Sequence, residues 1–590
     1  MFPSTLMLAY GTLCVLFAMT AASLSPPMMC QPPPAATDRA SDGPLPLLDL
    51  APYNDPSTFG IDWSSITKQA IDKDGLNLTM VSFDAMLLQW LGADWNTTVR
   101  VALPADASDL ASRSAVGVLP DIHTNNGQAA SAQDPTYRGA FPGWWHGTDG
   151  KGTKSNLDIT YSAAIAQATH AGGLGVPLVV ANPVPDDSRA LRLPAATLDA
   201  VLRWVDTTLE PPMDCTFRKI MGNCSGILGD AGEDQISYCM AAAGYATGDM
   251  RFLGDISFAV ALSRAVSMAE EVVSKHYAAV RWTRMVSIGN SKRGGLQKVF
   301  AAIDDRVIGV IQGGAPSANF SGLVDVATRT ETAAFMKDAD HIAHARGSEG
   351  WNAHESTFSV TRWAPSVLRR LFDAGAGLGF TNALGMIDQH ANAAACTFTF
   401  ADAANLRWLS VANYGHGMGS LDYAVKFREL VMLAAANASS SALLGCDASW
   451  DWSTNQVTAQ VSDPAAAAAT PTPTAPPLVG LWCVTAIQRN KAVMEFQPPL
   501  CDKAPVPPAD DSDFRQRRWS RVAMATATPI VSPGSDATYT FAAAVPAAAL
   551  RLNFAACYVR VQTGDGRVAT SAPLFGKRFC EKAGFVVDEK

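Results

Sequence analysis

The sequence predicts an α/β fold with a mostly parallel sheet flanked by helices, followed by a smaller C-terminal β domain. Two observations predict this fold. Short apolar runs alternate with helical patterns through the larger part of the chain, which is typical of βαβ units. After a Pro/Thr/Ala-rich tract at 463–477, the pattern changes to short strand-like runs separated by Pro, Gly and Asp.

Composition limits the classes of protein. The chain has 590 residues, of which 48% are hydrophobic and only 17% charged. This is enough apolar content for large cores and too little charge for a disordered chain. The net charge of −9 leaves no basic footprint, so we expect no nucleic-acid partner.

The N-terminal segment resembles an export signal in its pattern. An apolar run over Leu6–Met19 is shorter than the about 20 residues that a membrane span needs, and small residues follow it. We therefore expect a signal peptide at 1–23, a secreted protein and no stable membrane span. The alternative is an uncleaved signal anchor. A loose Pro/Ala/Asp-rich leader is expected at 24–45.

Elements of the large domain follow in order. Strand-like runs are expected at 177–180, 282–288, 307–312 and 409–412, and helices at 196–209, 252–276 and 291–303. Together they predict one domain over 46–462, with an insertion at about 320–380. The tract 463–477 is expected to be a linker.

The C-terminal region 478–590 is expected to be a small β domain. Strand-like runs occupy 478–487, 538–543 and 556–562, and no catalytic group of residues stands out among them. Ten cysteines lie outside the expected signal, an even number that favours disulfides in an exported chain; free buried cysteines are the alternative. The pairing stays open, and the candidates are Cys215, Cys224, Cys239, Cys483, Cys501, Cys557 and Cys580.

Sequons for N-glycosylation give the same indication of export. Each is a weak signal alone, because such triplets also occur by chance. They begin at Asn77, Asn96, Asn223, Asn319 and Asn437.

The most informative segment is Met285–Gly295, where an expected strand leads at once into an expected helix. This is the layout of a nucleophile elbow, which exposes the nucleophile on a sharp turn and needs small neighbours. Gly289 stands two residues before Ser291, but Arg293 replaces the second glycine of the usual G-x-S-x-G pattern. An ordinary turn with a capping serine is the alternative.

The segment Ser291–Gly294 reads S-K-R-G and resembles the elbow of the PhoPQ-activated pathogenicity-related protein family, which includes autocrine proliferation repressors. Matching segments in the same order are Gly175–Pro185, Glu233-Asp234 with Thr247–Asp249, and Asp305–Val307. The resemblance covers about 175–320 and extends more weakly to 420. It implies an exported protein with an α/β-hydrolase-type sheet and a serine nucleophile.

The remaining catalytic groups are expected in the order Ser, acid, His. His416 lies in a glycine-flanked loop after an expected strand, and Asp388 follows a turn that resembles the acid turn of the family. Asp402 is the alternative acid. Ser291 would attack a carbonyl, His416 would carry its proton and Asp388 would orient the imidazole.

An oxyanion hole would complete the site. The backbone N–H of Lys292 is one expected donor, and the glycine-rich segment around Gly147 and Thr148 is the candidate for the second. Lys292 and Arg293 either attract an acidic group of the substrate or pair with carboxylates of the protein. We expect no cofactor and no metal: His341, His344 and His354 lack a settled ligand spacing, and a surface helix is the favoured interpretation of that segment.

The sequence therefore favours a secreted serine hydrolase that cleaves a small-molecule ester or a peptide amide. The alternative is a secreted signalling or binding protein on a hydrolase scaffold, with a cell-surface receptor as its partner.

Overall fold

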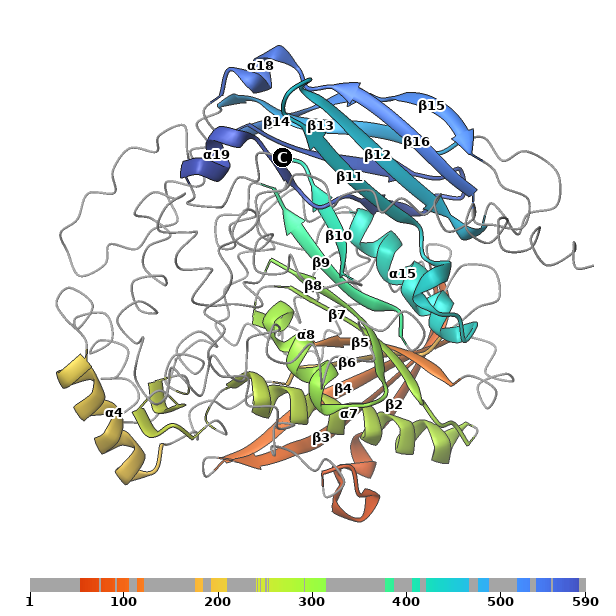
Figure 1. Ribbon diagram of the computed structural model, residues 1–590. Coiled ribbons are helices and arrows are strands. Elements are labelled where there is room, and N and C mark those ends of the chain that lie inside the picture. Colours follow the sequence, from red (N-terminus) through yellow and green to blue (C-terminus); the bar gives the residue numbers. More distant parts are fainter. Residues whose placement is uncertain are drawn as a thin grey trace, which may run out of the picture.

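The computed structural model describes residues 53–104, 114–120, 176–183, 193–208, 240–314, 377–386, 406–413, 421–465, 476–487, 517–530 and 537–582, with short gaps inside these ranges. Figure 1 shows the described elements as a long sheet with helices against it and a second, smaller sheet at the C-terminal end.

Six parallel strands form the centre of the molecule. Their order in the sheet differs from their order in the chain. The first of the six in the chain pairs with the second on one side and with the third on the other. These strands are β5 (Ala115–Pro120), β6 (Leu178–Ala181), β7 (Arg284–Asn290), β8 (Val307–Gly313), β9 (Gly379–Gly385) and β10 (Leu406–Val411), in the spatial order β6-β5-β7-β8-β9-β10.

Antiparallel strands extend this sheet on the β6 side. β4 pairs with β6 and with the 15-residue β3, which also carries the two short outer strands. Their bounds are β1 (Gly60–Ile61), β2 (Thr67–Lys73), β3 (Leu76–Trp90) and β4 (Ala93–Pro104); single 3-10 turns lie at Pro56–Thr58 and Trp63–Ser65.

Burial explains why the parallel strands have continuous apolar runs. Helices cover both faces of the sheet, so every residue of β5, β6, β8 and β9 is buried. Val118, Met285 and Val310 pack into one core with α7 and α8, whereas Ile288 and Ile311 pack into another with α15. The helices are α4 (Ala195–Thr208), α7 (Gly254–His276), α8 (Lys292–Ile303) and α15 (Leu421–Ala435).

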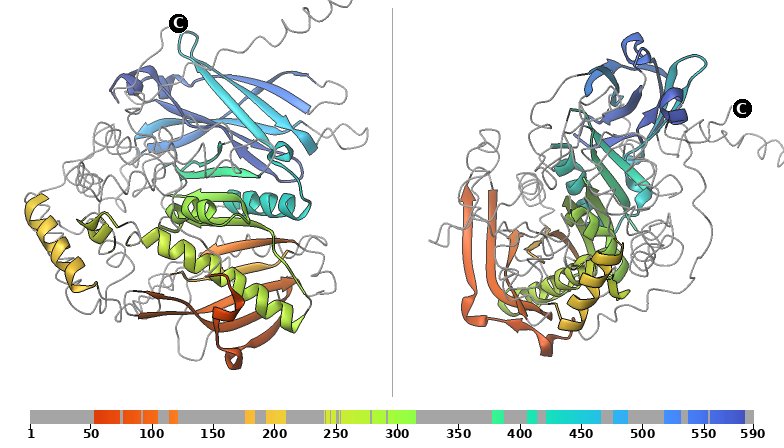
Figure 2. Two further views of the ribbon diagram at one scale, coloured as in Figure 1. Left: turned by 60° about the horizontal axis from the view of Figure 1, so that its bottom comes forward. Right: turned by 90° about the vertical axis from the view of Figure 1, so that its left-hand side faces the viewer.

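The C-terminal region contains two packed sheets. β18, β17, β13 and β14 continue the long sheet beyond β10, and β11, β12, β16 and β15 form a separate antiparallel sheet. Figure 2 shows these strands at one end of the molecule, with β2–β4 at the other. The bounds are β11 (Gly445–Asp451), β12 (Gln456–Asp463), β13 (Leu478–Ile487), β14 (Arg517–Ala523), β15 (Ala525–Ile530), β16 (Ala537–Ala544), β17 (Ala556–Gln562), β18 (Val568–Thr570) and β19 (Leu574–Phe575); short helices lie at Ser440–Ala442, α18 (Ala547–Leu550) and α19 (Lys577–Lys582).

The two C-terminal sheets share one hydrophobic core. Val457 and Val461 of β12 and Phe541 of β16 meet Leu481 of β13 and Val559 of β17 in this core. Burial alternates along β12 and β16, as it does when one face of a strand is packed and the other is wet. This arrangement is a β-sandwich.

The structure confirms the predicted fold class, a mostly parallel α/β sheet flanked by helices with a sandwich-like C-terminal part. It also confirms the predicted strands and helices between 177 and 312, the late strand β10, and the three predicted C-terminal strands. β11 lies before the tract 463–477 and β12 ends at its first residue, Asp463, yet β12 pairs with β16 over eight residue pairs. The proposed domain boundaries, the linker and the insertion at about 320–380 stay predictions. Among the described helices, none is long and apolar enough to cross a bilayer.

Candidate active site

The candidate site is centred on the junction between β7 and α8. β7 ends at Asn290 and α8 begins at Lys292, so a single residue, Ser291, separates a buried central strand from a helix. Ser291 itself lies outside the described residues. The strand and the helix on either side of it agree with the predicted elbow.

Gly289 shows why this junction needs a small residue. A Cβ atom at Gly289 would lie 2.3 Å from the backbone oxygen of Arg293 and 2.5 Å from Nε2 of Gln297. Gln297 Nε2 also donates to that same Arg293 oxygen at 2.9 Å, which fixes the first turn of α8. The close approach of helix and strand therefore excludes any side chain at 289, as a nucleophile elbow requires.

The start of α8 supplies backbone donors at this junction. Lys292 is the first residue of the helix, so its N–H belongs to the first turn, whose N–H groups have no acceptor within the helix. Such groups carry partial positive charge and suit a developing oxyanion. Arg293 is only 4% exposed, which supports pairing within the protein over attraction of substrate for this residue.

The carboxyl ends of β9 and β10 lie beside the end of β7 along one edge of the sheet. β7, β8, β9 and β10 are parallel neighbours, and the N–H of Met386, directly after β9, donates to the oxygen of Val411 at the end of β10 (3.0 Å). Asp388 follows β9 by three residues and His416 follows β10 by five. Both residues lie outside the described part of the chain, as do Asp402, Gly147 and Thr148.

The first two residues after β10 are described, and the C-terminal sandwich holds them. The N–H of Ala412 donates to the hydroxyl of Tyr558 at 2.8 Å. Asn413 donates from Nδ2 to the oxygen of Trp519 at 3.0 Å, and its Oδ1 accepts from the N–H of Trp519 at 2.8 Å. These contacts could not be predicted from the sequence, because the partners lie 106 and 146 residues away along the chain.

Burial and charge keep Tyr558 neutral and the nearby Arg560 charged. Burial raises the pKa of Tyr558 well above its usual value, so the phenol stays neutral. Arg560 lies two residues after Tyr558 on β17. Its hydrogen bonds to Asp422 raise its pKa and keep its guanidinium charged. The two nitrogens of Arg560 lie 2.7 and 2.8 Å from the carboxylate oxygens of Asp422.

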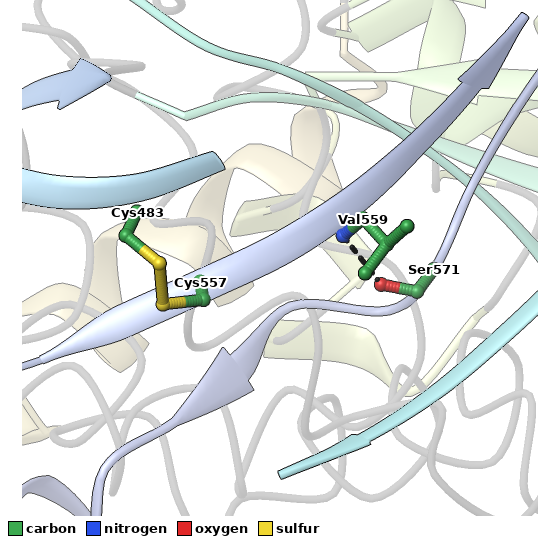
Figure 3. The surroundings of a disulfide bond; sticks show 4 residues. All are labelled: Cys483, Cys557, Val559 and Ser571. Atoms are coloured by element: carbon green, nitrogen blue, oxygen red, sulfur yellow. Dashed lines mark hydrogen bonds between the residues drawn. A yellow bond between two sulfur atoms is a disulfide. The ribbon is translucent and has the colours of Figure 1, made fainter. Parts of the chain in front are cut away.

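Three of the predicted disulfide candidates are described, and all three are bonded. Cys483 of β13 joins Cys557 of β17, as Figure 3 shows beside the hydrogen bond from the N–H of Val559 to Ser571. Cys580 is disulfide-bonded as well, whereas Cys446 is a free, buried thiol. The other candidates, Cys215, Cys224, Cys239 and Cys501, lie outside the described residues.

Three of the five predicted glycosylation sites lie in the described part of the chain. Asn96 in β4 and Asn437 after α15 are exposed, and Asn77 lies in β3. Asn223 and Asn319 lie outside the described residues, as do His341, His344 and His354. The described residues include no group of three or more metal-ligating side chains.

No family model matches the chain, and no curated protein matches it in sequence. Solved structures that match include acetyl xylan esterase 1 from a Thermoanaerobacterium species (12% identity, 65% of this chain and 93% of the other, TM-score 0.30). An S-formylglutathione hydrolase from Agrobacterium tumefaciens matches with 10% identity, 63% and 99% coverage and a TM-score of 0.31. An acetyl xylan esterase from a Paenibacillus species matches with 11% identity, 65% and 92% coverage and a TM-score of 0.33.

At these TM-scores the likeness to the three esterases carries no argument about substrate or mechanism. The fold is instead evident from the chain itself. Eight strands from β3 to β10 lie in the spatial order β3-β4-β6-β5-β7-β8-β9-β10, with the last six parallel, helices on both faces and a one-residue turn after the central β7. The chain is therefore built on an α/β-hydrolase scaffold, extended at its last parallel strand by a disulfide-bonded β-sandwich.

Proposed function

We propose that this protein is a secreted serine hydrolase of the PhoPQ-activated pathogenicity-related type, with Ser291 as nucleophile, His416 as base and Asp388 as acid. The observation that carries the proposal is the junction at Ser291. One residue separates a buried central strand from a helix, and the crowding at Gly289 leaves room for no side chain beside it. A serine between such a strand and helix has the sequence position of the nucleophile in an elbow, which supports Ser291 in that role.

The acid is argued from the strand ends. Asp388 comes three residues after β9 ends, and the carboxyl ends of parallel strands share one edge of the sheet. Asp402 instead comes four residues before β10 begins, and so on the amino-end side of that strand. This supports Asp388 over Asp402, because the acid must reach a histidine that follows the carboxyl end of β10.

The proposed reaction is acyl transfer to water. Ser291 Oγ attacks the carbonyl carbon of an ester or a peptide amide, and its proton passes to His416. The oxyanion accepts a hydrogen bond from the N–H of Lys292 at the start of α8, with a second donor from the segment around Gly147 and Thr148. His416 then protonates the leaving group, and water releases the acyl group by the same steps in reverse.

Export is part of the proposal. Cys483–Cys557 and the bonded Cys580 are typical of chains that mature in an oxidising compartment. Asn437 is exposed and so open to glycosylation. Secretion is tested by expressing the full chain in a eukaryotic cell and comparing its mass with that of Asn437→Gln before and after glycosidase treatment. Retention of an unglycosylated, uncleaved chain in the membrane fraction would favour the signal-anchored alternative.

The experiment that tests the proposed activity is covalent labelling by a fluorophosphonate, together with hydrolysis of p-nitrophenyl acetate and a panel of aminoacyl amides. We expect the wild-type protein to be labelled and Ser291→Ala not to be. Ser287→Ala is the matched control, because this serine lies four residues earlier, within β7, and its hydroxyl instead donates to the backbone oxygen of Val118 in β5 (3.2 Å). Labelling that persists in Ser291→Ala would contradict the assignment.

A further inference from the structure

The segment that carries the proposed base is held at both ends by the C-terminal sandwich. At its start, Ala412 and Asn413 bind Tyr558 and Trp519 through three hydrogen bonds of 2.8 to 3.0 Å. At its end, α15 begins at Leu421 and its first turn carries Asp422, which binds Arg560 through two bonds. His416 lies between these two anchors in the sequence.

The two hydrogen bonds between Asn413 and Trp519 fix both the position and the orientation of the Asn413 side chain. The Asn side-chain amide has a donor nitrogen and an acceptor oxygen side by side, and here both bond the backbone of a single strand residue, Trp519. Asn413 also has a φ of 54°, a left-handed conformation that Asn tolerates better than most residues. Gly would keep this conformation but lose both bonds.

Strand β17 contributes a side chain to each of the two anchors. Tyr558 and Arg560 are two residues apart on β17, so their side chains leave the strand on the same side. Tyr558 is 1% exposed, and its ring packs against Trp519 with centroids 5.5 Å apart. The residue before Tyr558 is Cys557, whose disulfide with Cys483 ties β17 to β13 (Figure 3).

We infer that Asn413, Tyr558 and Arg560 are positioning residues, through which the C-terminal sandwich fixes the two ends of the chain segment that carries His416. The catalytic meaning of this inference rests on the proposed function. A general base must lie within hydrogen-bond reach of its nucleophile, so a loop freed at one anchor holds its base less often in the productive geometry. Misplacement by about 1 Å is enough for a loss of roughly 100-fold.

The test compares Asn413→Gly with Asn455→Gly in the full-length protein. Asn455 has nearly the same φ, 53°, and lies in the turn between β11 and β12, where its backbone oxygen accepts from Val545. The control thus makes the same substitution in the same backbone conformation, at a turn of the sandwich away from β10. Tyr558→Phe is the second variant, because it removes only the hydroxyl that accepts from Ala412.

Two readouts separate the inference from the proposed function. The first is hydrogen exchange of the peptides that cover 412–421, which needs no activity. We expect Asn413→Gly and Tyr558→Phe to speed this exchange and Asn455→Gly to leave it unchanged. The second is kinetic: kcat for p-nitrophenyl acetate should fall about 10- to 100-fold in Asn413→Gly, with KM within roughly twofold of wild type.

Each outcome is decisive. If exchange of 412–421 and kcat in Asn413→Gly match those of Asn455→Gly, the inference is overturned. If exchange rises but the wild-type protein shows no Ser291-dependent hydrolysis, the proposed function fails and the anchoring of the loop still stands. An equal fall in kcat for all variants, with lowered thermal midpoints, would assign these residues a merely structural role and also overturn the inference.

Discussion

Two strand ends of the central sheet are held in different ways. The end of β7 is fixed by its own sequence neighbourhood, because α8 begins after a single residue and its backbone crowds Gly289. The end of β10 is fixed by residues far along the chain, Trp519 and Tyr558 in the sandwich. The proposed nucleophile therefore depends on local structure, whereas the proposed base depends on the assembly of both parts of the molecule.

The largest effect is expected from Gly289→Ala, which disrupts the packing of β7 against the start of α8. The new Cβ would lie 2.3 Å from a backbone oxygen, so the strand and helix must separate. We expect a loss of about 3 kcal/mol in the free energy of unfolding, the upper end for overpacking by one methyl group, and almost no labelling of Ser291. Denaturant unfolding and fluorophosphonate labelling measure the two effects.

Gly564→Ala is the control for this variant, because a Cβ atom at Gly564 would meet no atom within 4 Å. It should keep the stability and labelling of the wild type. Wild-type labelling in Gly289→Ala would mean that the junction at Ser291 accommodates the added methyl group. It would contradict the claim that local crowding at Gly289 fixes the end of β7.

The hold of the sandwich on the end of β10 is tested next by the double variant Cys483→Ala with Cys557→Ala. The disulfide closes a loop of 74 residues, and removing it should cost about 2 kcal/mol, a low value for such a loop because Cys580 forms another cross-link. Hydrogen exchange should rise in peptides of β17 and in 412–421 more than in peptides of β7 and α8. Equal increases at both strand ends would show that the sandwich does not act selectively on β10.

A smaller effect is expected from Arg560→Gln. The side chains of the ion pair are 25% and 15% exposed, between the surface and the interior, so its loss should cost about 1 kcal/mol. Exchange should rise mainly at the start of α15, near Asp422, and less at Asn413. Unchanged exchange at the start of α15 would show that the second anchor of the loop does not depend on this pair.

The last prediction concerns a loss of wild-type stability in acid, which we expect to arise at Asp304, directly after α8. Burial opposes its ionisation, but the bonds from Arg306 and Ser263 outweigh burial and hold the pKa of Asp304 below its ordinary value of 3.8. A lowered pKa means that folding favours the charged form. The resulting stability is complete above pH 3.8 and is lost as the pH falls through the lower folded value.

Denaturant unfolding of wild type and Asp304→Asn from neutral pH down to about pH 3 measures this dependence. The wild type should lose more stability on acidification than the variant. Parallel curves would show that Asp304 does not stabilise the α8 side of the sheet through its charge.

The same contrast explains what the sequence predicts and what it cannot. β7 and α8 are predicted because their apolar periodicity, the small residue Gly289 and the serine all lie within about 20 residues. β9 gave no strand signal, because buried strands need no alternation and this one buries the polar Thr381 and Asn382 at 0% exposure. The hydrogen bonds between Asn413 and Trp519 could not be predicted either, because contacts across 106 residues produce no local sequence pattern.

The pairing of β10 with β18 has a consequence for any shortened form of the protein. Trp408 pairs with Thr570, and the Thr570 hydroxyl accepts from the N–H of Ser410, so the long sheet runs unbroken from one part into the other. A chain that ended before β13 would leave β10 as an open edge, with unpaired backbone groups next to the loop of the proposed base. Open edges of this kind recruit strands from other molecules, so such a truncation is expected to aggregate and should not be read as a test of catalysis.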